Sequence, residues 1–96
     1  MMELIVLNVK DGQNISFTGQ VAASVLDRSA NNYIAVYETK KEHWLIAFTT
    51  ISDMLIRHEV IENKEVDKLI DYLGFSEATK SIYQQLGIDT TNKLDI

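Results

Sequence analysis

Cysteine and proline are absent from this chain of 96 residues, and glycine occurs only four times. Without cysteine the chain forms no disulfide and has no thiol nucleophile. It also has no zinc or iron–sulfur site of the kind built from cysteine ligands. Because small secreted domains often depend on disulfides, the absence of cysteine favours a reducing compartment.

Long apolar runs are lacking as well. The N-terminal stretch MMELIVLNVKDG is interrupted by Asn8 and has no basic flank of the kind that precedes a signal sequence. No run approaches the ~18 apolar residues that a membrane-spanning helix needs. We therefore expect a soluble, cytoplasmic protein that does not bind membranes.

Basic residues are outnumbered, with nine Lys and Arg against fourteen Asp and Glu and a net charge of -5. The one dense basic spot is Lys40-Lys41, and Glu38 and Glu42 bracket it. Proteins that bind duplex nucleic acid neutralise phosphates with a basic face. The charge balance therefore predicts no nucleic-acid binding.

Catalytic and metal-binding motifs are missing too. His43 and His58 lie fifteen positions apart, whereas a metal site needs three or four convergent ligands. Gly19 stands alone, outside any phosphate-binding loop pattern, and neither Ser24 nor Ser52 has the sequence context of a nucleophile. We expect a protein that is not an enzyme and has no metal and no cofactor.

The residues that are present begin with a β-hairpin. Segments 3–9 and 13–19 flank Lys10-Asp11-Gly12. A three-residue loop places apolar residues opposite one another, with Leu7 facing Ile15 and Ile5 facing Phe17. Such a loop often ends in a left-handed residue, so positive φ is expected at Gly12. The second strand is expected to continue through 20–27, with a bend or bulge at Gly19.

A second hairpin is predicted within NYIAVYETKKEHWLIAFTT, residues 32–50. Strands 33–38 and 43–50 would be joined at TKKE, with Glu38 facing His43 as a cross-strand charge pair. This register places four aromatic residues on one face: Tyr33, Tyr37, Trp44 and Phe48. The other face then carries aliphatic residues: Ile34, Val36, Leu45 and Ala47.

The remainder of the chain changes from strand to helix. Residues 51–62 are ambiguous, and we expect a loop or single helical turn to about Arg57, followed by a short fifth strand. Asn63 is the expected N-cap of a first helix, which ends at Gly74; Ser76 is the expected cap of a second, which ends at Gly87. Residues 88–96 form a tail.

Strands followed by helices indicate an α+β architecture. We predict a four- or five-stranded, mainly antiparallel sheet followed by two C-terminal helices packed on one face. Residues 1–96 would form a single small α+β domain: a sheet portion over 1–62, two helices over 63–87 and a tail over 88–96. This length matches one domain.

Two short helices cover only one side of a sheet, which leaves open what the second apolar face contacts. The aromatic face is either the core beneath the helices or an accessible surface. Large aromatics suit both settings, because Tyr and Trp tolerate a half-wet position and are enriched at binding hot spots. We favour the second interpretation, in which the aliphatic face packs on the helices.

The candidate interaction surface is therefore Tyr33, Tyr37, Trp44 and Phe48. We expect a small cytoplasmic, non-enzymatic interaction protein that uses this face to form a homodimer or to bind a protein partner. The alternative is a small-molecule-binding domain or minor enzyme with an aromatic-lined pocket between sheet and helices. A closed pocket with convergent polar groups would favour the alternative.

Overall fold

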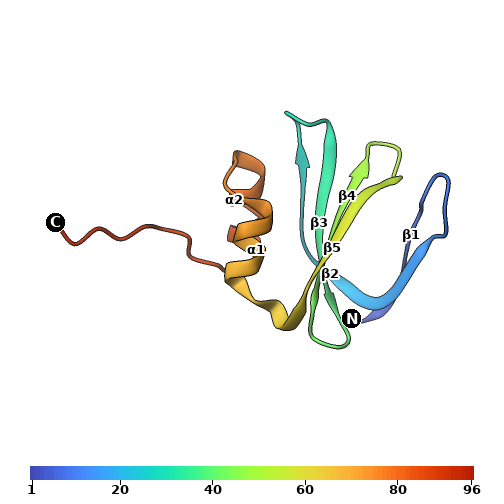
Figure 1. The fold of residues 1–96 in the computed structure, drawn as a ribbon, viewed down its shortest axis with the longest axis horizontal. Coiled ribbons are helices and arrows are strands. Elements are labelled where there is room, and N and C mark those ends of the chain that lie inside the picture. Colours follow the sequence, from blue (N-terminus) through green and yellow to red (C-terminus); the bar gives the residue numbers. More distant parts are fainter.

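The computed structural model describes residues 1–96 and shows a single antiparallel sheet followed by helices (Figure 1). Five strands lie side by side in the order of the sequence: β1 (Glu3–Leu7), β2 (Ile15–Asp27), β3 (Asn32–Thr39), β4 (Trp44–Thr50) and β5 (Leu55–Ile61). The helices α1 (Val66–Leu73) and α2 (Glu77–Leu86) follow. The predicted α+β fold class is confirmed.

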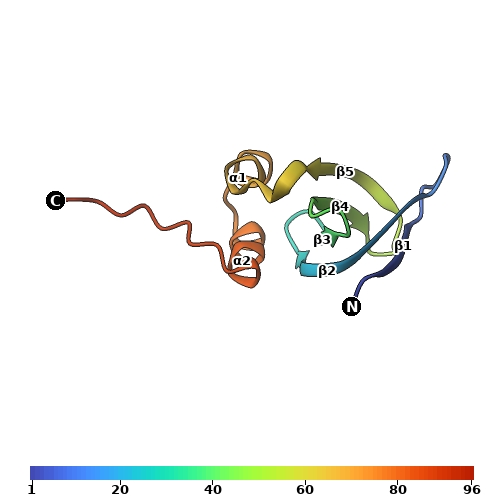
Figure 2. The ribbon, with the colours of Figure 1, turned by 90° about the horizontal axis from the view of Figure 1, so that it is seen from below.

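The sheet curls until its two outer strands meet at one end. The Leu55 N–H donates to the Asn8 carbonyl at 2.8 Å, and Asn8 forms an isolated bridge with Met54. Figure 2 shows the strands arranged around a common interior, with both helices outside it. The five strands therefore form a partly closed barrel rather than a flat sheet.

The long strand β2 bends to follow this curl. Its pairing with β3 shifts between Val21 and Ala23, which makes Ala22 the bulged residue. Gly19 contributes differently, because a Cβ built on it would lie 2.5 Å from the Glu38 carbonyl oxygen. The irregularity expected at Gly19 is therefore a bulge three residues later, next to a close backbone approach that only glycine permits.

The ends of the helices agree with the cap residues expected from the sequence, with one exception. The Ser76 hydroxyl accepts the Thr79 N–H at 3.1 Å, and the Thr79 hydroxyl accepts the Ser76 N–H at 2.8 Å. Gly74 (φ 67°) and Gly87 (φ 74°) end the two helices. Asn63 is not an N-cap: it lies at φ 56° within a 3-10 helix, η1 (Glu62–Lys64), so that α1 begins only at Val66.

Two apolar clusters fill the molecule. The larger lies between the outer face of the sheet and the helices, and its members are Ala23, Ile34, Val36, Trp44, Ile46, Phe48, Ile61, Leu69, Ile82 and Tyr83. The smaller lies inside the barrel, where Leu7, Leu45 and Ala47 are buried and Ile5, Ile15, Phe17, Tyr37 and Leu55 pack against them. Each face of the central strands therefore has its own core.

The register predicted for the first hairpin is confirmed, whereas its loop is not. Leu7 pairs with Ile15 and Ile5 pairs with Phe17. The ladder ends there, and the Asn14 side chain accepts the Val9 N–H at 2.9 Å. Positive φ among the glycines occurs at Gly74 and Gly87, so the left-handed conformation expected at Gly12 is wrong.

The register predicted for the second hairpin is wrong by one residue. Glu38 pairs with Trp44 instead of His43, and Tyr37 pairs with Leu45. The loop contains three residues, because Thr39 and His43 close it and Glu42 takes up a left-handed φ of 64°. A one-residue slip moves each side chain of a strand to the opposite face relative to its partner strand.

A turn of the same type joins β4 to β5. The Thr50 N–H donates to the Met54 carbonyl at 2.8 Å, the Met54 N–H donates to the Thr50 hydroxyl at 3.1 Å, and Asp53 has a φ of 68°. The helical turn or loop expected to reach Arg57 is therefore wrong, and β5 begins at Leu55. None of the helices has the length and apolar character to cross a membrane.

Candidate binding site at the mouth of the barrel

The aromatic face expected from the sequence does not exist as one surface. Trp44 and Phe48 lie on the helix side, and each is only 7% exposed. Tyr33 and Tyr37 lie on the opposite face of β3, where Tyr33 is 41% exposed and Tyr37 packs on Phe17 with ring centroids 5.3 Å apart. The expectation that these four side chains share a face is wrong, because it depended on the slipped register.

The aliphatic set is divided in the same way. Ile34 and Val36 are buried in the core beneath the helices, as expected. Leu45 and Ala47 are buried instead inside the barrel. The second apolar face of the hairpin is therefore covered in large part by the curl of β1 and β2, which brings Ile5, Leu7, Ile15 and Phe17 over it.

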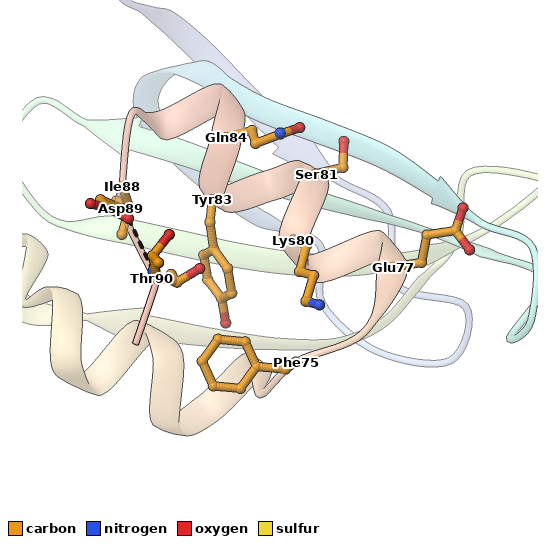
Figure 3. Close-up of a pocket in the computed structure, with 10 residues that line it drawn as sticks. Phe75, Glu77, Lys80, Ser81, Tyr83, Gln84, Ile88, Asp89 and Thr90 are labelled. Carbon is orange, nitrogen blue, oxygen red and sulfur yellow. Dashed lines mark hydrogen bonds between the residues drawn. The ribbon is translucent and has the colours of Figure 1, made fainter. Parts of the chain in front are cut away.

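The largest cavity, of about 860 Å³, lies between α2 and the segment that follows Gly87 (Figure 3). Its buried polar group is the Tyr83 hydroxyl, which donates to the Gly74 carbonyl at 2.6 Å. Burial raises the pKa of Tyr83 above the usual tyrosine value. The rim carries both signs of charge, including Glu77, Lys80 and Asp89. With its buried polar group already bonded and its charges mixed, this cavity has no evident chemical preference.

A smaller cavity of about 380 Å³ opens at the end of the barrel where β3 turns into β4. Its apolar lining comes from three strands: Phe17 of β2, Leu45 of β4 and Val60 of β5. Leu45 and Val60 are cross-strand partners and share the inner face of the sheet. Polar residues frame the opening: Thr18, Thr39, Lys40, Lys41 and His43. We name this cavity the barrel mouth.

The charge at the barrel mouth has one sign. Lys40 and Lys41 line it, no carboxylate does, and neither lysine forms an ion pair within the chain. The nearby Glu38 is bonded instead to Lys64, with 3.3 Å between Oε1 and Nζ. The barrel mouth is therefore a local basic opening on a chain whose net charge is -5.

His43 adds a directed hydrogen-bond donor to this rim. Its Nδ1 accepts the Asn63 backbone N–H at 2.9 Å. A neutral imidazole whose Nδ1 is an acceptor carries its proton on Nε2. No group of the chain accepts from Nε2, so this N–H is free for a ligand. The charge pair expected between His43 and Glu38 is wrong, since Glu38 pairs with Trp44 in the ladder.

Inside the barrel, Tyr37 is the remaining polar aromatic group. Burial, and to a smaller extent the negative charge of Asp53, raises the pKa of the Tyr37 hydroxyl above the usual tyrosine value. At neutral pH this hydroxyl is therefore protonated. Nowhere does the chain gather three or more His, Asp or Glu side chains able to hold a metal ion.

Lys40-Lys41 is visible in the sequence as the one dense basic spot, but its place beside an apolar cavity is not. Leu45 and Val60 meet because β4 pairs with β5, and Phe17 approaches them because the sheet curls. The available signal was the alternation of apolar and polar residues at the start of β2, which places Ile15 and Phe17 on one face. No known protein family, curated protein or solved structure matches the chain.

Proposed function

We propose that this chain is a non-enzymatic binding protein whose barrel mouth accepts an anionic ligand with an apolar body. The observation that carries the proposal is the combination of an apolar floor with a rim of Lys40, Lys41 and the His43 Nε2–H, without any carboxylate. Ligand sites are typically apolar cavities with a few convergent polar groups. The barrel mouth, with a volume of about 380 Å³, is at the small end of such sites.

The proposal keeps the expectation of a binding protein but moves its site. The centre of the layer between sheet and helices holds no pocket, because Val36, Ile46, Leu69 and Ile82 are completely buried there, and the hollows between sheet and helices lie at its margins. Self-association through a four-residue aromatic face loses its basis, since Trp44 and Phe48 are core residues. The absence of cysteine favours a reducing, cytoplasmic setting.

The apolar floor supplies most of the affinity under this proposal. Each methylene of a ligand that becomes buried contributes about 0.8 kcal/mol. An exposed ion pair contributes only about 0.2–1 kcal/mol. Lys40 and Lys41 therefore select the sign of the ligand's charge, while Phe17, Leu45 and Val60 bind its apolar part.

Isothermal titration with decanoate tests the proposal, with decyltrimethylammonium as the ligand of opposite charge. We expect decanoate to bind and the cation to bind about two- to thirtyfold more weakly, as the loss of two ion pairs of about 0.2–1 kcal/mol each implies. The double variant Lys40→Gln/Lys41→Gln should weaken decanoate binding by a similar factor. The matched control Lys10→Gln/Lys80→Gln removes the same charge elsewhere, including at the larger cavity, and should bind like the parent.

The floor is tested with Val60→Asp. Because Val60 is 44% exposed, we expect this replacement to leave the barrel folded. A carboxylate at this position should abolish decanoate binding. Equal binding of decanoate and the cation, or equal loss in both double variants, would contradict the proposal.

A further inference from the structure

We propose that the ligand of the barrel mouth is an extended peptide segment that adds to the free edge of β5 as a sixth strand. The segment would carry an apolar and an acidic side chain on the face that looks into the barrel mouth. This inference rests on the proposed function and specifies its ligand. Three features of the chain support it: an unpaired strand edge, a hollow on each face of that edge, and the basic rim.

The outer edge of β5 has no partner over most of its length. β5 is the last strand of the sheet, with β4 on one side only. Its outward backbone contact is the bond from the Leu55 N–H to Asn8, at the end remote from the barrel mouth. An unpaired edge presents a row of N–H and C=O groups to another chain.

The part of β2 that extends beyond β1 is protected by contrast. Beyond Gly19, β2 has no pairing with β1. There the side chain of Gln85 on α2 bonds the backbone of Ser24 twice: its Oε1 accepts the Ser24 N–H at 3.0 Å, and its Nε2 donates to the Ser24 carbonyl at 2.9 Å. No helix side chain makes such bonds to β5. The outer edge of β1, on the other side of the sheet, is unpaired as well, but no residue of β1 lines a cavity, so β5 is the unpaired edge that borders the hollows.

A hollow lies on each face of the β5 edge near Val60. The barrel mouth is on the inner face. On the other, an open hollow of about 370 Å³ lies between β5 and α1, lined by Glu59, Val60, Ile61, Lys68, Asp71 and Tyr72. Side chains of an added strand alternate between its two faces. Beside Val60, the side chains on one face of the added strand would therefore point toward the barrel mouth, and those on the other face would point toward the hollow beside α1.

The charges of the two hollows differ, and this difference defines the peptide. The barrel mouth contributes Lys40 and Lys41 without a carboxylate, which favours an acidic side chain beside an apolar one. The hollow beside α1 is lined by two carboxylates, Glu59 and Asp71, and by Lys68, which is paired with Glu65; this lining disfavours an acidic side chain and suits uncharged polar ones. Peptides added to a sheet edge take affinity from main-chain bonds and specificity from such alternate pockets.

The probe is a capped hexapeptide in which leucine and aspartate occupy every second position and threonine occupies the others. Two isomers carry backbone N-methyl groups, either on all the threonines or on all the leucine and aspartate residues. Successive N–H groups of a strand point to opposite edges, so only one isomer loses the bonds to β5. We expect that isomer to bind at least about tenfold more weakly than the parent, and the other isomer to bind within about twofold of it.

Binding is followed by isothermal titration and by amide shifts of residues 56–61. Replacing the aspartates of the peptide with lysine should weaken its binding to the parent protein. The protein variant Lys40→Gln/Lys41→Gln should likewise bind the acidic peptide more weakly, by about fivefold. Equal binding of both N-methyl isomers and the parent peptide would overturn strand addition. Absence of peptide binding to a protein that binds decanoate would overturn the inference and leave the proposed function standing, whereas absence of decanoate binding would remove the proposed function.

Discussion

Replacing Trp44 with alanine separates the two accounts of the hairpin. Trp44 is 7% exposed and belongs to the core between β4 and the helices, with Ile46, Leu69 and Ile82 in the same cluster. Emptying a buried Trp site costs about 3–5 kcal/mol. A domain of this size has a stability of the order of 5–15 kcal/mol, so Trp44→Ala should remove a large part of it.

The matched control is Tyr33→Ala, because Tyr33 is 41% exposed and lies on the other face of the sheet. We expect Tyr33→Ala to cost less than about 1 kcal/mol, as replacements of half-exposed surface residues usually do. Urea unfolding should be followed by far-UV circular dichroism, since Trp44 is the single tryptophan and its fluorescence disappears in the variant. The slope of the unfolding free energy against urea concentration should be similar in the parent and in both variants.

A shared aromatic surface would give the opposite pattern. Trp44→Ala would then weaken association and leave the free energy of unfolding within about 1 kcal/mol of the parent. That result, or equal destabilisation by Trp44→Ala and Tyr33→Ala, would refute the assignment of Trp44 to the core.

Other predictions address the turns, the bend and the charges. Gly19→Ala should destabilise by about 1–3 kcal/mol in urea unfolding, because its Cβ would meet the Glu38 carbonyl; an unchanged midpoint would contradict the close approach. Glu42→Gly should stabilise by up to about 1 kcal/mol, since φ is 64° there, whereas the control Lys41→Gly should not. Because the pKa of Tyr83 is raised in the folded chain, its neutral hydroxyl contributes to the free energy of unfolding. This contribution is complete below the unfolded tyrosine pKa of about 10 and is lost as pH rises through the higher folded value. Urea midpoints between about pH 8 and pH 11 should therefore fall less steeply in Tyr83→Phe than in the parent; equal slopes would contradict this. Finally, the chain should give no gel shift with duplex DNA at moderate salt, because its net charge of -5 repels the phosphates. A salt-sensitive gel shift would contradict this expectation.

The parts of the fold that were predictable depend on local signals. Ser76, Gly74 and Gly87 are cap residues whose chemistry is independent of the rest of the molecule, and the ends they predicted are those observed. The register of the first hairpin followed from matching apolar residues, with Leu7 opposite Ile15. In each case the deciding interaction lies within a few residues of the signal.

The register of the second hairpin was predicted wrongly because Glu42, the left-handed residue of its turn, carries no such signal. Glu42 and Asp53 adopt left-handed φ values that glycine or asparagine usually occupies. With TKKE taken as a four-residue loop, apolar residues matched well on both faces, and nothing in the sequence contradicted the slip. Both faces of β4 are apolar because both are buried, so hydrophobic alternation could not determine the register.

The barrel mouth was beyond local reasoning for a different reason. It requires the curl that brings Asn8 to Met54, a contact between residues 46 positions apart, and the bulge at Ala22 that lets β2 bend. Lys40 and Lys41 were visible as a basic pair, but their partners in the site belong to β2 and β5. Only the assembled sheet places these two positive charges at the opening of an apolar cavity.

The most direct test of the binding site is a titration of the isotope-labelled chain with decanoate, followed by amide chemical shifts. The account predicts saturable shifts centred on Thr18, Lys40, His43 and Val60, a weaker affinity in Lys40→Gln/Lys41→Gln, and loss of the shifts in Val60→Asp. Shifts centred on Lys80 and the other residues of the larger cavity, or no saturable shifts at all, would contradict it.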